Sequence, residues 1–241
     1  MKLADATWTD VRDTDTRLAL LPVGSTEGHG PHAPLGTDTL GAESVAAAGA
    51  ERYEDEHGEP VVVGPPVTVG ISEEHRAFDG TLWVSPETFR SYVRETVESL
   101  AHHGLDRVVL VNGHGGNVDA LREVSARLTR DETAYTAPFT WFESVGEHSS
   151  DMGHAGPLET ALLRHTNPDL VREDRIEEAK RGGSDRWGEW VSGVNLAYDS
   201  DEFTENGVVG DPREGDADRG AELLDLASEG LVDLLDALAA K

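Results

Sequence analysis

The sequence predicts an α/β protein with three layers, α/β/α, around a mostly parallel central sheet. Short apolar segments typical of buried strands alternate with longer helical patterns, an order that favours parallel strands covered by helices on both faces. The chain of 241 residues has no internal repeat and is long enough to bury a sizeable core. We therefore expect residues 1–241 to form a single domain.

The expected strands are short apolar runs that end at turn residues. Leu18–Val23 is bounded by Gly24, and Arg107–Asn112 is bounded by Gly113. Two further short runs, at residues 61–63 and 133–139, complete the set.

Helical patterns occupy most of the chain between and after these strands. Ser85 and Pro86 start one helix as its cap and first-turn proline, and Gly104 ends it. Thr37 is the expected N-cap of a helix that is rich in small residues. The expected helices cover residues 38–52, 85–103, 117–130 and 214–240, with irregular stretches at 64–80 and 182–206.

Metal-binding side chains follow two of the expected strands. Gly-Ser-Thr-Glu-Gly-His-Gly-Pro-His (24–32) contains Glu27 and His29, and Val-Asn-Gly-His-Gly-Gly-Asn (111–117) contains His114. An extended backbone directs Glu27 and His29 to the same side, and sites in open α/β sheets form outside the carboxyl ends of strands. With Asp38, these residues form a nitrogen and oxygen ligand set for one or two divalent metals. The chain is therefore a candidate metallohydrolase.

Other chemistries have weaker support. Glycine-rich segments are often only turns, and neither segment has the lysine of a phosphate-binding P-loop. Ser25 lacks the Gly-x-Ser-x-Gly surroundings of a nucleophilic serine, so Ser25 and Thr26 are interpreted as turn residues that support Glu27. The absence of Cys excludes a thiol nucleophile and Cys-bound zinc.

Several motifs together resemble the creatininase family of metal-dependent amidohydrolases. The resemblance extends from about residue 15 to the C-terminus and includes Asn-Gly-His-Gly-Gly-Asn and His-Ala-Gly-Pro-Leu-Glu-Thr. It rests on residues 18–40, 75–81, 111–117, 154–160 and 206–213. It implies a creatininase-like three-layer fold and a dinuclear metal site. It also implies hydrolysis of a carbon–nitrogen bond in a cyclic amide, an amide or a formamide by metal-activated water.

The resemblance also implies which residues bind the metals. Glu27, Asp38 and His114 resemble the ligands of one ion. His29 and Asp38 resemble those of the second ion, with the Asp38 carboxylate as the bridge. The two divalent ions are expected to be zinc, iron(II) or manganese.

Gly116 departs from the pattern of creatininase proper, which carries Glu two residues after the metal-binding His. Glu159, in His-Ala-Gly-Pro-Leu-Glu-Thr, is the expected replacement ligand. The missing Glu weakens creatinine as the substrate. Members with the Gly-Gly form act on a formylamino-pyrimidine ribonucleotide, on the route to flavins and deazaflavins, or on a modified peptide. The deformylase is therefore the alternative function.

His154 and Glu159 are the expected catalytic residues. If Pro157 starts a helix, Glu159 lies in its first turn and His154 in the preceding loop. A histidine titrates near neutrality and can protonate the departing nitrogen of the substrate. The alternative is that His154 only caps the loop or bonds a backbone carbonyl. His32 and His75 lie in family-like motifs but are not expected to be ligands.

A small-molecule amide or formamide is the expected substrate. A phosphate-bearing substrate would need Arg or backbone N–H groups, for which the sequence offers Arg76 and Arg186. The opposing hypothesis is a non-catalytic binding or scaffold protein that kept the fold. The family resemblance implies a homo-oligomer.

Two aromatic pairs leave alternatives open. Trp187 and Trp190 belong to a substrate-side lid, to a subunit contact or to ordinary loop packing. Trp141 and Phe142 follow a strand end, where they either line the pocket or belong to the core.

The chain is strongly acidic, with 47 Asp and Glu against 20 Lys and Arg and a formal charge of −27. Such a surface repels nucleic-acid phosphates and anionic membranes, so neither is an expected partner. The acidic residues are spread through the chain, which favours a halophilic protein adapted to high salt over one that binds a basic partner. No apolar run has the length of a secretion signal or a membrane span, so a cytoplasmic protein is expected.

Overall fold

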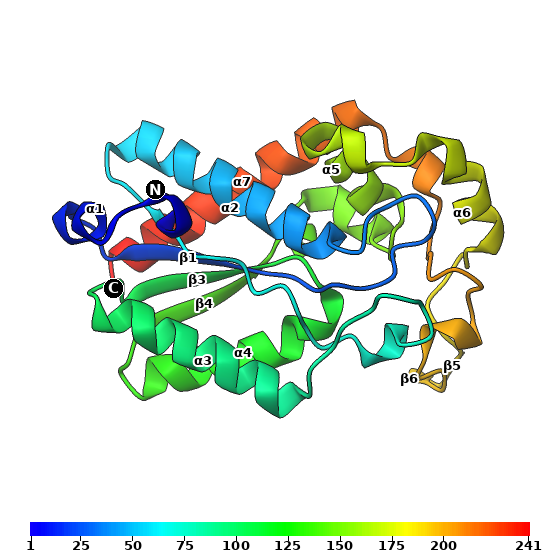
Figure 1. Ribbon diagram of the computed structural model, residues 1–241, viewed down its shortest axis with the longest axis horizontal. Coiled ribbons are helices and arrows are strands. Elements are labelled where there is room, and N and C mark those ends of the chain that lie inside the picture. The colour runs from blue at the N-terminus through cyan, green and yellow to red at the C-terminus, as the bar shows by residue number, and fades with distance from the viewer.

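A parallel four-stranded sheet forms the centre of the molecule (Figure 1). The computed structural model describes residues 1–241. The strands, in the spatial order β2-β1-β3-β4, are β1 (Leu18–Val23), β2 (Val62–Val63), β3 (Arg107–Asn112) and β4 (Tyr135–Thr140). All three neighbouring pairs are parallel, which confirms the predicted sheet. β1 and β3 have the predicted bounds because the sheet buries each apolar run on both faces.

Helices cover both faces of the sheet, so the predicted three-layer fold is confirmed (Figure 1). One layer contains α2 (Thr37–His57), α5 (Pro157–Thr166) and α7 (Ala217–Ala239). The other contains α3 (Pro86–His102) and α4 (Val118–Arg130). The remaining α-helices and strands are α1 (Trp8–Asp13), α6 (Ile176–Gly182), β5 (Trp190–Val191) and β6 (Val194–Asn195).

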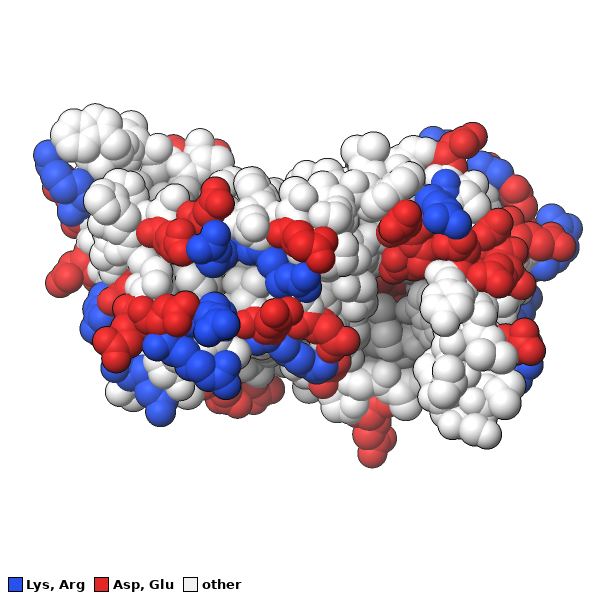
Figure 2. Space-filling view, turned by 90° about the horizontal axis from the view of Figure 1, so that it is seen from below, with Lys and Arg blue, Asp and Glu red and all other residues white.

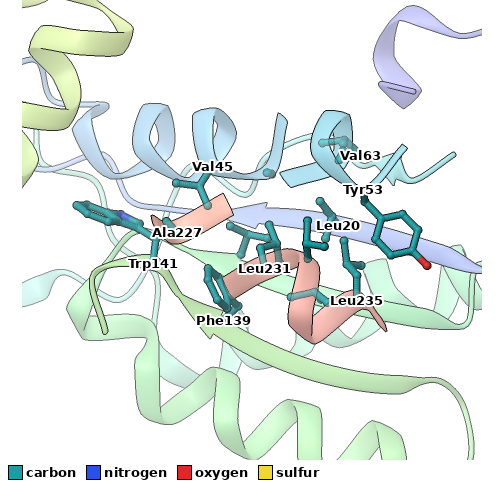
Figure 3. Close-up of a cluster of buried hydrophobic side chains, with 14 of the residues drawn as sticks. Leu20, Val45, Tyr53, Val63, Phe139, Trp141, Ala227, Leu231 and Leu235 are labelled. Atoms are coloured by element: carbon teal, nitrogen blue, oxygen red, sulfur yellow. The ribbon is translucent and has the colours of Figure 1, made fainter. Parts of the chain in front are cut away.

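The pleat of β1 divides the hydrophobic core into two layers. Successive side chains of a strand point to opposite faces of the sheet. Leu18 and Leu20 therefore pack with α2 and α7, in the cluster that Figure 3 shows. Ala19, Leu21 and Val23 belong to the second cluster, with α3 and α4. Because both layers are filled, β1 is held firmly and its carboxyl end is a rigid support for a site.

The helix ends agree with the sequence at α3 and differ at α2. The Ser85 hydroxyl accepts a hydrogen bond from the Thr88 amide at 3.2 Å, and Gly104 has a φ of 88°, as a helix cap and a stop require. The prediction that Thr37 caps α2 is wrong. Thr37 is the first residue of the helix, and its hydroxyl donates to the Pro34 carbonyl at 2.7 Å.

Two short 3₁₀ helices interrupt connections near the sheet ends, at Glu73–His75 and Gly115–Asn117. The irregular stretch 182–206 contains the antiparallel hairpin of β5 and β6. None of the helices combines the length and the hydrophobicity that crossing a lipid bilayer requires.

Charged side chains crowd the surface that Figure 2 shows. Basic and acidic residues are interspersed over the half that α3 and α4 occupy. On the other half, acidic residues gather beside an uncharged patch, which lies where Figure 1 places β5 and β6. With a formal charge of −27, repulsion between surface carboxylates opposes folding in dilute buffer.

We expect the melting temperature to rise by about 10 °C from dilute buffer to molar KCl, equivalent to about 3–5 kcal/mol for a chain of this size. Salt screens the repulsion between the carboxylates, and sucrose at matched water activity is the control because it leaves charges unscreened. Scanning calorimetry measures the melting temperature in KCl and in sucrose. One transition is expected if residues 1–241 are a single domain. Equal melting temperatures in dilute buffer and in KCl would refute adaptation to high salt.

Candidate metal centre

The carboxyl ends of β1 and β3 and the first turns of α2 and α5 converge on one buried cluster of acidic and histidine side chains. β1 and β3 are neighbours in the sheet, so residues that follow them come close in space. All six residues that the sequence proposes for the site are buried there: Glu27, His29, Asp38, His114, His154 and Glu159.

Two glycines allow the first turn of α2 to approach the strand ends. A Cβ atom on Gly113 would lie 2.2 Å from the Asp38 carbonyl oxygen, and one on Gly24 would lie 2.4 Å from the Thr39 amide nitrogen. Any side chain at either position would push α2 away. The glycines therefore place Asp38 between the residues that follow β1 and β3.

Asp38 lies between two histidines and offers one oxygen to each. Its Oδ1 is 3.0 Å from His29 Nε2, and its Oδ2 is 3.1 Å from His114 Nδ1. Glu27 Oε1 is 3.2 Å from the same His114 nitrogen, and Glu159 Oε1 is 3.8 Å from His29 Nε2. Both oxygens of Glu27 are buried without a hydrogen-bond partner.

Backbone carbonyls hold one ring nitrogen of each site histidine. His29 Nδ1 donates to the Glu27 carbonyl at 3.1 Å, His114 Nε2 to the Ile71 carbonyl at 2.7 Å, and His154 Nε2 to the Gly28 carbonyl at 2.8 Å. A carbonyl only accepts, so each of these nitrogens carries the proton. The other nitrogen of each ring then faces the cluster, the orientation that metal-binding histidines adopt.

The charges of the cluster stabilise a cation at its centre. Burial by itself would lower the pKa of His29 and of His114, but the neighbouring carboxylates raise both pKa values well above the usual value. Burial opposes ionisation of Glu27, yet His114 and the other histidines hold the pKa of Glu27 well below its usual value. A nitrogen lone pair this close to carboxylates needs a proton or a metal ion between them, so the donor set fits divalent cations.

The side chains form three overlapping groups whose ligand atoms lie within 4.8 Å of one another. One comprises Glu27, His29 and Asp38; the second His29, His154 and Glu159; the third Glu27, His75 and His154. His75 was not an expected ligand, yet its Nε2 is 3.7 Å from Glu27 Oε1. The local motif does not reveal this, because the 3₁₀ helix of His75 meets the cluster only in the folded chain.

His154 lies at the centre of the site rather than at its edge. Its ring centroid is 4.2 Å from those of His29 and His75, and its Nδ1 is 3.6 Å from Glu27 Oε1. Burial, followed by the charge of His29, lowers the pKa of His154, which favours the neutral ring. His154 also donates a hydrogen bond to a backbone carbonyl, the alternative that the sequence offers to an acid/base role. The two are compatible, because the bond fixes Nε2 and leaves Nδ1 free.

A cleft of about 350 Å³ opens onto these residues. Phe142 and Trp187 line the cleft, whereas Trp141 is fully buried in the core. Each of the two aromatic pairs therefore has one member at the cleft. Trp190 is exposed on the hairpin. The cleft is lined by Asp38, Glu74, His75, His114, Gly115, Gly116, Phe142, Met152, Gly153, His154, Glu159 and Trp187.

No Lys or Arg is among the residues that line this cleft. Arg76 pairs with Asp199 at 2.5 Å on the surface. Arg186 lines a neighbouring cavity of about 390 Å³. The two arginines that the sequence offers for a phosphate therefore do not line the cleft itself.

Gly116 is required for the orientation of His114. A Cβ atom at position 116 would lie 2.2 Å from the Ile71 carbonyl oxygen, which accepts the hydrogen bond of the His114 ring. Position 116 therefore cannot bear the Glu of creatininase proper without displacing this backbone.

Gly116→Ala is expected to lower metal affinity by about 10–100-fold, because partners that orient a metal-binding histidine contribute about that much. Competition with a chromophoric chelator measures the affinity. Gly115→Ala is the matched control, since a Cβ atom there would meet nothing within 4 Å. Equal affinities of the two variants would show that the Ile71 contact does not orient His114.

A family model described as creatininase, creatinine amidohydrolase, matches residues 4–235. The chain belongs to the creatininase family. The creatininase relatives include a mycofactocin precursor peptide peptidase of Mycobacterium tuberculosis, 32% identical over 239 residues, with 92% of this chain and 85% of the peptidase covered. The same-named protein of Mycobacterium ulcerans is 39% identical over 163 residues, with 65% of this chain covered. The match spans only 61% of that relative's length.

Solved structures of the creatininase family share the fold of this chain. A candidate creatinine amidohydrolase of Bacteroides fragilis superimposes with a TM-score of 0.83 and 25% identity, covering 100% of this chain and 97% of its own. A manganese form of creatininase superimposes with a TM-score of 0.81 and 21% identity, covering 100% and 99%. These agreements confirm the creatininase-like three-layer fold.

Proposed function

We propose that this creatininase-family chain is a metal-dependent amidohydrolase that cleaves a carbon–nitrogen bond of an amide. One observation carries the proposal. Three buried histidines each have one ring nitrogen tied to a backbone carbonyl while the other faces buried carboxylates. Such a cluster is poised for cations and opens directly onto a cleft.

The proposed ligands follow the distances in the cluster. Glu27, Asp38 and His114 would hold one ion; His29, Asp38 and Glu159 would hold the second. The two Asp38 oxygens face different histidines, which supports a bridging carboxylate. Zinc, iron(II) and manganese suit this set of imidazole and carboxylate ligands. Divalent ions held by these residues would lower the pKa of water and polarise the substrate carbonyl.

The chain's own residues supply proton transfer. The neutral His154 ring has a free lone pair on Nδ1, beside the cluster. We propose that Nδ1 accepts the proton of the attacking water and passes it to the departing nitrogen. The Gly28 carbonyl stabilises the charged ring in between, because it accepts the Nε2 proton throughout.

The cleft favours a peptide-like amide over a nucleotide. A formylamino-pyrimidine ribonucleotide carries a phosphate, and the cleft offers that phosphate no Lys or Arg. The neighbouring cavity shares Met152, Gly153 and Trp187 with the cleft, which gives an extended substrate room beyond the metal cluster. Arg186 lines that cavity together with four acidic residues, so its surroundings also disfavour a phosphate. The printed names of the two mycobacterial relatives also point to a peptide. The deformylase alternative therefore has less support.

Metal analysis with chelation tests the proposal. Protein purified in high salt should contain about two divalent ions per chain. Dialysis against a chelator should abolish amide hydrolysis, and zinc, manganese or iron(II) should restore it. A panel of short peptides, creatinine and a formylamino-pyrimidine nucleotide would rank the substrate classes. Protein that takes up none of the three metals would refute the hydrolase and favour the scaffold hypothesis.

A homo-oligomer remains a prediction. The uncharged hairpin supports it, because Trp190, Val191 and Val194 are each more than half exposed. Contiguous apolar surface of this kind is typical of protein contacts. Light scattering in molar KCl measures the mass directly.

A further inference from the structure

Glu74 is an acidic residue of the cleft that the proposed mechanism does not use. It lies in the 3₁₀ helix Glu73–His75, is half-buried and lines the cleft. Its neighbour Glu73 points to solvent instead and pairs with Arg76 at 3.5 Å. The two adjacent glutamates therefore have different surroundings, and only Glu74 faces the site.

Gly116 leaves the space that Glu74 enters. The Glu74 Oε1 atom lies 3.0 Å from where a Cβ of residue 116 would be. A side chain at position 116 would occupy this wall of the cleft and displace the carboxylate. Because residue 116 has no side chain, the Glu74 carboxylate, from another segment of the chain, occupies this part of the cleft wall.

Glu74 is the free carboxylate of the cleft. The other two acidic residues that line it, Asp38 and Glu159, belong to the three groups whose ligand atoms lie within 4.8 Å of one another, here called the metal-competent groups. Glu74 belongs to none of these groups, and no Lys or Arg lines the cleft to neutralise it. Burial raises the pKa of Glu74; in its ionised form the carboxylate can only accept hydrogen bonds, and such bonds are strongest from a charged N–H donor.

We propose that Glu74 determines substrate specificity by binding a cationic N–H group, such as a protonated amine near the amide to be cleaved. The proposal rests on the proposed function, since it assigns this group to the substrate of the same cleft. No cationic side chain lies within salt-bridge distance of Glu74, and a bound ammonium group would donate a charge-assisted hydrogen bond to its carboxylate at short range. The same carboxylate repels phosphate and carboxylate groups, which adds to the exclusion of nucleotides.

Two small amides of the same backbone test the proposal. Glycinamide carries a protonated amine beside its amide, and N-acetylglycinamide is neutral. Isothermal titration calorimetry with the metal-loaded protein should show about tenfold tighter binding of glycinamide, the contribution of a charge-assisted hydrogen bond. Glu74→Gln should remove this preference while metal content stays unchanged. Glu73→Gln, one residue away and exposed, should behave as the wild type.

Several results would overturn the proposal. These are equal binding of the two amides by the wild type, binding of neither, and a preference that survives in Glu74→Gln. Loss of metal from Glu74→Gln would instead make Glu74 a ligand and also overturn the specificity role. A protein that holds metal and hydrolyses amides without the preference refutes only this inference. A protein that binds no metal refutes the proposed function.

Discussion

The double variant Glu27→Ala/His114→Ala is expected to lose at least one of the two proposed ions and to lose amide hydrolysis by a factor on the order of 10³ or more. The two side chains contact each other at 3.2 Å, and His114 also contacts Asp38 Oδ2 at 3.1 Å, so their removal eliminates two of the three proposed ligands of one ion. Without the ion, water in the cleft returns to a pKa near that of bulk water, and hydroxide is no longer available at neutral pH.

Elemental analysis and a discontinuous amide assay measure the two effects in the same preparation. Glu51→Ala/His102→Ala is the matched control, because it removes the same residue types from exposed positions. A double variant that keeps about two ions per chain would refute the assignment of Glu27 and His114. The control should retain the metal content and the activity of the wild type.

His154→Ala is expected to lower kcat by about 10²–10⁴-fold, the usual contribution of a positioned acid/base group. Metal content should change little if His154 moves protons. The geometry makes this a stringent test, because His154 also belongs to two of the metal-competent groups. Its ring is held by the Gly28 carbonyl through Nε2, which leaves Nδ1 for proton transfer.

Single-turnover kinetics and metal analysis on the same sample separate the two roles. Added imidazole should restore part of the activity of His154→Ala, because the missing ring leaves room beside a cleft of about 350 Å³. His165→Ala, at an exposed position, is the control. Loss of metal from His154→Ala without rescue by imidazole would assign His154 as a ligand instead.

Local sequence patterns determined the elements that deliver the site. β1 and β3 are confirmed at their predicted bounds because each is a continuous apolar run closed by glycine. Pro157 starts α5 as predicted, which places Glu159 in the first turn and His154 just before it. The candidate ligands Glu27, His29 and His114 lie in the two segments that come after the strands. Each of these predictions depends on residues within a few positions of one another.

Tertiary structure alone decided which residues share the cleft. His75 and Glu74 reach it because the 3₁₀ helix Glu73–His75 packs against the His114 loop, where Gly116 has no side chain. Phe142 and Trp141 are both buried, yet only Phe142 lines the cleft, a difference that sequence position does not encode.

The physical reason is the range of the interactions. Hydrophobic periodicity and turn residues act over one element, so the sequence by itself determined the α/β class, the strand ends and the histidine and carboxylate residues that are candidates for the ligand set. The approach of α2 to the strand ends depends on Gly24 and Gly113, which follow two different strands. The ring nitrogens of His29 and His114 and both oxygens of Asp38 are aligned by contacts between distant segments. Only the folded chain brings these segments together, and it thereby decides the geometry of the site.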